Sequence, residues 1–162
     1  MALTKVQDGG LNLTSAGLPS GSILQVVTTT STTQESTTSN TMVDSSALTA
    51  TITPKSSSNK IFIIAAINGL YNDTNQSAAS MTILRDSTDL ADSGNTYGMS
   101  YSYASSGGGL VGSNTPCLLD SPATTSAITY KVQFCRSSIG TGTAYITVAS
   151  TTSTLTLMEI AG

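Results

Sequence analysis

Histidine and tryptophan are absent from this chain of 162 residues, and charged residues make up only 9% of it. Without histidine there is no Ser–His–Asp or Cys–His nucleophile and no histidine-ligated metal. Lys and Arg number 6 against 9 Asp and Glu, which gives a formal charge of −3. The basic residues form no run that would neutralise a series of phosphates, so we expect no nucleic-acid partner.

Long apolar stretches are missing as well. No run reaches about 18 apolar residues, so we expect no membrane insertion. The N-terminus MALTKVQDGG lacks the apolar region of a secretory signal, and we therefore expect the protein to be made and folded in a cytoplasm. Cysteine is also scarce. Cys117 and Cys135 are expected to be free thiols, with a disulfide as the alternative, and two thiols without histidine make a poor metal site.

Carboxylates are the remaining candidates for acid–base chemistry. Asp86, Asp89 and Asp92 in RDSTDLADSG are spaced for turns, which Asx capping explains without catalysis. Their oxygens, like those of residues 71–77 (YNDTNQS), are of the kind that Ca²⁺ prefers, but neither stretch matches the twelve-residue calcium loop. The Gly-rich residues 105–113 (SSGGGLVGS) lack the Lys and Ser/Thr of a phosphate loop and indicate a flexible loop. We interpret the protein as a non-enzyme without cofactor or metal.

What the chain does contain is serine and threonine, 54 residues or a third of the sequence, together with 38% hydrophobic residues. Disorder is one interpretation of so much Ser and Thr, but it usually accompanies high charge and low hydrophobicity. Here the apolar residues fall in periodic blocks and β-branched residues abound, which favours an all-β protein.

Strand patterns recur from Ser22 onward, separated by turn residues. Eight to ten short strands predict an antiparallel β-sandwich of the jelly-roll kind over residues 22–162. An immunoglobulin-like sandwich is less favoured, because the Cys–Trp–Cys spacing is missing. The expected strands are 22–30, 36–43 (weak), 47–53, 61–67, 80–86, 97–103, 116–120, 128–135, 144–150 and 154–160, and residues 69–78 are expected to form a polar loop.

Residues 1–21 form a separate N-terminal segment. Glycines and a proline interrupt it, so we expect no long regular element. Its apolar side chains are too sparse for a core of their own, so the segment is either a frayed terminus or an arm that docks on another surface. The candidate anchor residues of such an arm are Leu3, Val6, Leu11 and Leu13.

Residues 61–67 are apolar at every position, although a strand with one solvated face needs an apolar residue only at every second position. Ile61, Ile63, Ala65 and Ile67 would pack on one side. The other side would carry Phe62, Ile64 and Ala66, and we expect it to face another copy of the chain. The alternative is a long loop of the same chain, such as residues 96–114, lying over the strand.

Two tyrosine- and amide-rich stretches are candidates for binding. In TYGMSYSY, alternation predicts one face for Tyr97, Met99, Tyr101 and Tyr103, either as a platform for sugar rings or a protein partner, or as an aromatic core between sheets or subunits. The expected loop also carries amide and carboxylate groups typical of carbohydrate contacts, or of a solvated turn. The loop candidates are Tyr71, Asn72, Asp73 and Asn75.

Several motifs together resemble a known family. GSILQVV followed by ALTATITPKSSSNKIFIIAAI, the pair Arg85–Asp86 in TILRD, and the ending ITYKVQF, AYITV and TLTLMEI are similar to a domain of fibre and appendage proteins of tailed bacteriophages, notably marine and cyanobacterial ones. The short N-terminal MALTKV resembles the virion-attachment arm that begins many such proteins. The resemblance covers about residues 20–160.

The resemblance implies a virion structural protein with a homotrimeric jelly-roll-like head, assembled in the host cytoplasm. Its N-terminal arm would dock on other virion proteins, and its distal loops would bind a glycan or protein of the host surface. Fibre proteins usually carry shaft repeats, which this chain lacks, so a capsid decoration or cement protein is the alternative. A small lectin-like module unrelated to virions is a third.

Overall fold

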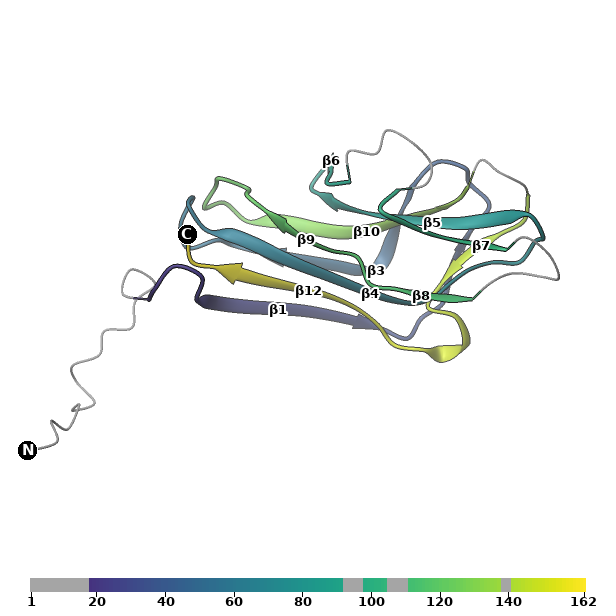
Figure 1. The fold of residues 1–162 in the computed structure, drawn as a ribbon, viewed down its shortest axis with the longest axis horizontal. Helices are drawn as coiled ribbons and strands as arrows, with labels where there is room; N and C mark the ends of the chain where they lie inside the picture. The colour runs from purple at the N-terminus through teal and green to yellow at the C-terminus, as the bar shows by residue number, and fades with distance from the viewer. Residues whose placement is uncertain (1–17, 92–97, 105–110, 138–140) are drawn as a thin grey trace, which may run out of the picture.

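Alternating apolar and polar residues form two antiparallel β-sheets that pack face to face (Figure 1). The computed structural model describes residues 18–91, 98–104, 111–137 and 141–162. The strands are β1 (Ile23–Ser31), β2 (Glu35–Thr37), β3 (Val43–Ile52), β4 (Lys60–Asn72), β5 (Ser77–Arg85), β6 (Thr88–Asp89), β7 (Ser100–Ala104), β8 (Gly112–Asn114), β9 (Cys117–Asp120), β10 (Ile128–Arg136), β11 (Ala144–Ile146) and β12 (Ser153–Ile160).

The strand order is that of a jelly roll, as the sequence predicts. Sheet I runs β1-β12-β4, with β9 and β8 paired to β4 and with β11 and β2 continuing it. Sheet II runs β3-β10-β5, with β6 and β7 paired to β5. Four nested antiparallel pairs, β1–β12, β3–β10, β4–β9 and β5–β7, each join an early strand to a late one. This is a long hairpin wound into a sandwich.

The core lies between the sheets, and β4 contributes most to it. Its four inward residues Ile61, Ile63, Ala65 and Ile67 are completely buried, as alternation predicts. They pack in one cluster with side chains of the facing sheet, including Tyr130 of β10. The other set on β4, Phe62, Ile64 and Ala66, is only half-buried and lies on the outer face of sheet I.

The structure corrects several expected boundaries. β4 extends to Asn72 and β5 begins at Ser77, so the expected loop over residues 69–78 shrinks to the hairpin turn 73–76. The expected strand 144–150 ends at Ile146. Three of the next four residues, among them Thr147 and Ala149, have φ near +55°, a conformation that cannot continue a strand. β6 and β8 are short strands that sequence patterns did not indicate.

The two ends of the sandwich differ. Both the C-terminus and Leu18, where the described chain begins, lie at the end where β4 starts, which we call the proximal end (Figure 1). Gly21 N–H donates to Ala161 O at 2.8 Å, and Ala161 N–H donates to Ser22 O at 2.9 Å, which fixes the start of the chain there. The β4–β5 hairpin lies at the distal end, because the 13 residues of β4 span about 40 Å.

Candidate functional site

Two tyrosines meet beside the β4–β5 hairpin at the distal end. Tyr71 of β4 is paired with Tyr145 of β11, and their ring centroids lie 5.6 Å apart with planes tilted by 31°. Asp73 follows in the turn, and its Oδ2 accepts a hydrogen bond from Tyr145 Oη at 3.3 Å. We call Tyr71, Asp73 and Tyr145 the distal cluster.

Asp73 is held as an exposed carboxylate. Its Oδ1 accepts hydrogen bonds from the Thr143 N–H at 2.7 Å and from Thr74 Oγ1 at 3.0 Å. These bonds, above all that from Thr143, favour the ionised form and lower the pKa of Asp73. The cluster therefore combines aromatic faces with an anionic acceptor, a combination suited to sugar hydroxyls and rings.

The other hairpin candidates have different positions. Asn72 is only 1% exposed. Its Oδ1 accepts from Thr74 N–H at 2.9 Å, and its Nδ2 donates to Ala78 O at 3.3 Å. Asn72 thus builds the turn, and its buried side chain does not lie on the surface as expected. Asn75 is exposed at the tip of the turn.

The tyrosines of β7 are more exposed than the half-buried Tyr71 and Tyr145. Tyr101 is 53% exposed and Tyr103 39% exposed, on a strand paired with β5. Met99 does not share their face as alternation suggested, because it packs against the core. Gly98 turns the chain just before it, with φ +58° and no room for a Cβ against Met81 O. Tyr97 lies outside the described residues.

The structure therefore brings the candidate tyrosines together only in part. Tyr71 belongs to sheet I and the β7 tyrosines to sheet II. Sequence reasoning missed Tyr145, because only the pairing of β11 with β4 places it beside Tyr71, 74 positions earlier in the sequence. The available signal was the strand pattern of AYITV. Its alternation predicts that the Tyr145 side chain points to the opposite face of the strand from Ala144 and Ile146.

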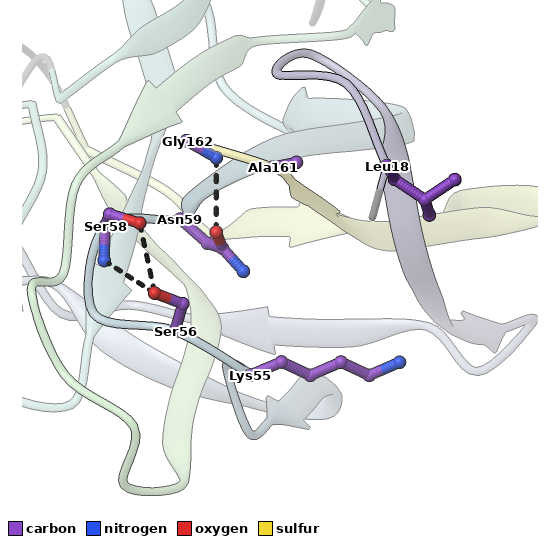
Figure 2. Close-up of a pocket in the computed structure, with 7 residues that line it drawn as sticks. All are labelled: Leu18, Lys55, Ser56, Ser58, Asn59, Ala161 and Gly162. Carbon is purple, nitrogen blue, oxygen red and sulfur yellow. Dashed lines mark hydrogen bonds between the residues drawn. The ribbon is translucent and has the colours of Figure 1, made fainter. Parts of the chain in front are cut away.

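The proximal end carries a shallow cleft of about 330 Å³ (Figure 2). Its lining is mixed in character, with Lys55 as the only charged side chain, and Gly162 N–H donates to Asn59 Oδ1 at 3.1 Å within it. Among the described residues, the cleft lining contains no pair of carboxylate side chains. The lining residues are Leu18, Lys55, Ser56, Ser58, Asn59, Ala161 and Gly162.

Glu159, the second-to-last residue of β12, is completely buried close to this cleft. Three donors surround its carboxylate at 2.6 Å each: Asn59 Nδ2, the Lys55 N–H and Gln25 Nε2. Burial by itself raises the pKa of Glu159, but these hydrogen bonds together outweigh burial and lower the pKa below its ordinary value. The carboxylate thus ties β1 and the β3–β4 turn to β12.

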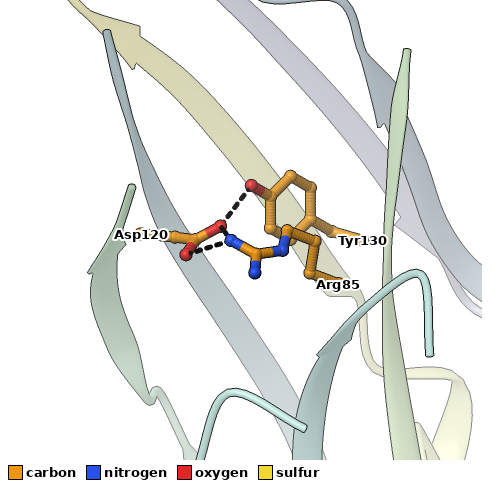
Figure 3. Close-up of polar contacts among 3 residues, drawn as sticks. All are labelled: Arg85, Asp120 and Tyr130. Carbon is orange, nitrogen blue, oxygen red and sulfur yellow. Dashed lines mark hydrogen bonds and ion pairs between the residues drawn. The ribbon is translucent and has the colours of Figure 1, made fainter. Parts of the chain in front are cut away.

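A second polar cluster joins the two sheets near the same end (Figure 3). Arg85 Nη1 lies 2.8 and 2.9 Å from the two carboxylate oxygens of Asp120, and Tyr130 Oη donates to Asp120 Oδ2 at 2.7 Å. Burial, reinforced by the Asp120 carboxylate, raises the pKa of Tyr130. Arg85 is therefore paired with Asp120, although the sequence places Asp86 next to it.

Asp86 instead occupies the β5–β6 turn with φ +52°. Its Oδ1 accepts from Thr129 N–H at 3.0 Å. Asp89 Oδ1 accepts from Ala91 N–H at 2.9 Å, the Asx arrangement that the spacing predicts, while Asp92 lies outside the described residues. The described part of the chain contains no group of three or more Cys, Asp or Glu side chains placed to hold a metal ion.

Within the described ranges no helix has the length and apolar character needed to span a bilayer. Cys117 is exposed on β9 and Cys135 is buried on β10, so the two thiols lie on different sheets. The candidate anchor residues Leu3, Val6, Leu11 and Leu13 fall outside the described residues. No known protein-family model matches the chain, and no curated protein is significantly similar to it in sequence.

Proposed function

We propose that the protein is a virion structural protein of a tailed phage, a short fibre or appendage. Residues 1–21 would anchor it to other virion proteins, its sandwich would assemble as a homotrimeric head, and its distal surface would bind the host. The single observation that carries the proposal is that the start of the described chain and the distal cluster lie at opposite ends of the sandwich. The described chain begins at the proximal end, and the distal cluster lies about 40 Å away along β4.

The proposed ligand of the distal cluster is a host-surface glycan. Tyr71 and Tyr145 offer aromatic faces that a sugar ring can stack on, and the Asp73 carboxylate can accept hydrogen bonds from sugar hydroxyls. Such a site, made of two half-buried tyrosines and one exposed carboxylate, binds a sugar weakly on its own. Several copies on one particle would raise the overall strength of attachment by avidity.

Immunogold labelling of phage particles with an antibody against the protein tests the virion role. Labelling at the tail, together with binding of the purified protein to cells or to a glycan array, supports the proposal. Labelling spread over the capsid shell, without cell or glycan binding, would favour the decoration role instead. Particles that carry no label would refute both.

The double variant Tyr71→Ala/Tyr145→Ala tests the distal cluster directly. We expect it to reduce glycan or cell binding by about tenfold to a hundredfold, because each stacked aromatic contributes on the order of 1 kcal/mol. Thr51→Ala/Thr129→Ala is the control, since these two threonines contact each other on β3 and β10 of the other sheet, outside the cluster. Equal binding by wild type and the double variant would show that Tyr71 and Tyr145 are not part of the receptor site.

A further inference from the structure

The outer face of sheet I carries apolar side chains in register across four strands. Cross-strand pairing aligns Val26 of β1 with Met158 of β12, Met158 with Phe62 of β4, and Phe62 with Leu119 of β9. All four belong to the outward-facing sets of their strands, and Val26 and Leu119 are 54% and 53% exposed. One unbroken apolar row therefore crosses the sheet on the side away from the core.

The neighbouring rows are uncharged and mixed in character. One residue pair farther along β4, Ile64 lies between the exposed Cys117 and Thr156, which is paired with Thr28. The next row contains Ala66 with Thr154 and Thr30. The charged residue on this surface is Lys60, at its proximal margin. We call these rows, from Lys60 to Ala66 along β4, the apolar face.

The outer face of sheet II is different and provides an internal comparison. Its β3 and β10 residues are polar: Lys131 Nζ lies 2.6 Å from Asp44 Oδ2, Gln133 also donates to Asp44, and Thr51 contacts Thr129 at 2.9 Å. That face has the character of a solvated sheet surface. Sheet II exposes Tyr101 and Tyr103 on β7, but its β3–β10 part carries charged and polar pairs, whereas the central row of sheet I is apolar across four strands. This difference favours the outer face of sheet I as the covered one.

The dimensions of the apolar face decide between possible covers. Four strands about 4.8 Å apart and six residues of rise give a face of about 15–20 Å by 20 Å. The 17 residues that precede Leu18 would cover a band only about one strand wide as an extended segment. A surface of this size with no charge at its centre matches the apolar centre of a standard protein interface, which buries about 800 Å² per partner with its polar rim.

We propose that the apolar face is where copies of this chain pack against one another. Around a three-fold axis the apolar faces of three copies would converge, so uncharged rows meet without repulsion and bury Val26, Phe62 and Leu119 together with Cys117. This inference deepens the homotrimer of the proposed function, because it identifies the surface that holds the copies together. It also extends the expected interface of Phe62, Ile64 and Ala66 from one strand to four.

A matched pair of valine variants tests the surface. Val26→Lys places a charge at the β1 end of the apolar row, and Val111→Lys places the same charge on an equally exposed valine next to β8, outside that row. In light scattering at concentrations where the wild type has the mass of three chains, we expect Val26→Lys to have the mass of one chain and Val111→Lys that of three. An assembled Val26→Lys protein would overturn the inference.

The native cysteines give a second readout that needs no substitution on the face. Cys117 lies on the apolar face, whereas Cys135 is buried in the sandwich and burial raises the pKa of its thiol to about 11. We expect a thiol reagent to modify Cys117 at least about tenfold more slowly in the assembled wild type than in Val26→Lys, because reaction then requires opening of the interface. Cys135 should be equally slow in both proteins and reports intact folding.

The outcomes separate this inference from the proposed function. A trimer in which Cys117 reacts as fast as in Val26→Lys would keep the homotrimer and overturn the apolar face as its interface. A monomeric wild type would overturn both the homotrimer and the interface, while particle labelling and glycan binding would still decide the virion role. If Val26→Lys does not fold, as judged by fast modification of Cys135, Leu119→Lys on β9 replaces it in the same comparison.

Discussion

At the scale of single residues, Glu159 shows how this sparsely charged chain uses a carboxylate in its interior. A buried anion is costly unless donors compensate for the lost water. Here the donors come from two segments remote in sequence, Gln25 of β1 and the turn residues Lys55 and Asn59. The Glu159 carboxylate therefore connects β12 to β1 and to the β3–β4 turn at the proximal end.

We expect Glu159→Gln to lower the free energy of unfolding at pH 7 by about 1–3 kcal/mol, because at least one of the three donors loses its acceptor and the rest lose the charge. The pKa of Glu159 lies below its ordinary value of 4.5. Its stabilising effect is therefore complete above about pH 4.5 and is lost as the pH falls through the lower, folded-state pKa.

The measurement is chemical denaturation of both proteins between pH 7 and pH 3. The stability difference between wild type and Glu159→Gln should be constant down to about pH 5 and then narrow, because the wild-type carboxylate becomes protonated. A difference that stays the same at all pH values would show that the charge of Glu159 contributes nothing to stability.

At the scale of elements, the bulge at Gly69 decides which side chains of β4 reach the surface. Residues Ile61 to Ile67 alternate with the odd positions inward, and the register shifts between Asn68 and Leu70. After the shift Leu70 points inward and Tyr71 outward. Without this bulge, strict alternation would place Tyr71 in the core rather than in the distal cluster.

We expect Gly69→Ala to destabilise the protein by about 2–4 kcal/mol, through a positive φ and a clash. Gly69 has φ +76°, and an added Cβ would clash with Val148 Cγ2. Gly21→Ala is the control, since Gly21 has φ +90° but nothing within 4 Å, and should cost only about 1 kcal/mol. Thermal unfolding of both variants measures the difference, and equal losses would mean that the contact with Val148 is easily relieved.

The second prediction at this scale concerns the ion pair between sheets. Asp120 of β9 accepts hydrogen bonds from Arg85 and Tyr130 of sheet II, and its side chain is only 10% exposed. We expect Asp120→Asn to cost about 2–3 kcal/mol, because it leaves the Arg85 charge without its partner in a half-buried site.

Asp44→Asn provides the comparison for Asp120→Asn. The Asp44 side chain is 49% exposed in its pair with Lys131, so this change should cost at most about 1 kcal/mol. Urea denaturation of the two variants side by side measures both losses. If Asp120→Asn lowers the free energy of unfolding as little as Asp44→Asn does, the Arg85–Asp120 ion pair does not contribute to holding the sheets together.

At the scale of the whole molecule, the two ends of the sandwich differ, and the described chain begins and ends at the proximal one. Backbone hydrogen bonds hold Gly21 and Ser22 to Ala161, and Ile23 is already paired with Ile160 in the sheet. The first strand of the sheet is therefore held by hydrogen bonds that begin at Gly21.

Deletion of residues 1–17 should leave an assembled, folded sandwich that no longer joins particles. Circular dichroism and light scattering would check folding and assembly, and western blotting of purified particles would check incorporation. Normal incorporation of the truncated protein would overturn the anchoring role of Leu3, Val6, Leu11 and Leu13. Loss of folding would show instead that the segment is part of the sandwich.

Much of the fold follows from local patterns that the sequence displays. The runs around Ile52 and Leu157 alternate and the run around Ile63 is apolar throughout, so their strands could be predicted. The bounds failed where the backbone departs from regular geometry, at the Gly69 bulge and after Ile146, where side-chain type gives little sign of a positive φ. β8 was missed because three residues, Gly112 to Asn114, contain no apolar pattern at all.

The candidate site was less predictable than the fold. The hairpin carrying Tyr71 and Asp73 is visible in the sequence as a turn rich in amides and carboxylates. Its partner Tyr145 is not, because the two strands that pair there are joined by 71 intervening residues. The same reason explains Arg85, whose partner Asp120 lies on another sheet rather than at the next position in the chain.

The sequence by itself determined the all-β class, the sandwich and the two-sided character of residues 61–67, because alternation and side-chain type act locally along each strand. Only the tertiary structure decided which residues meet: Tyr71 with Tyr145, Arg85 with Asp120, and Val26, Met158, Phe62 and Leu119 in one row. These contacts join strands from opposite halves of the jelly roll, and their register depends on bulges and turns that no local pattern encodes.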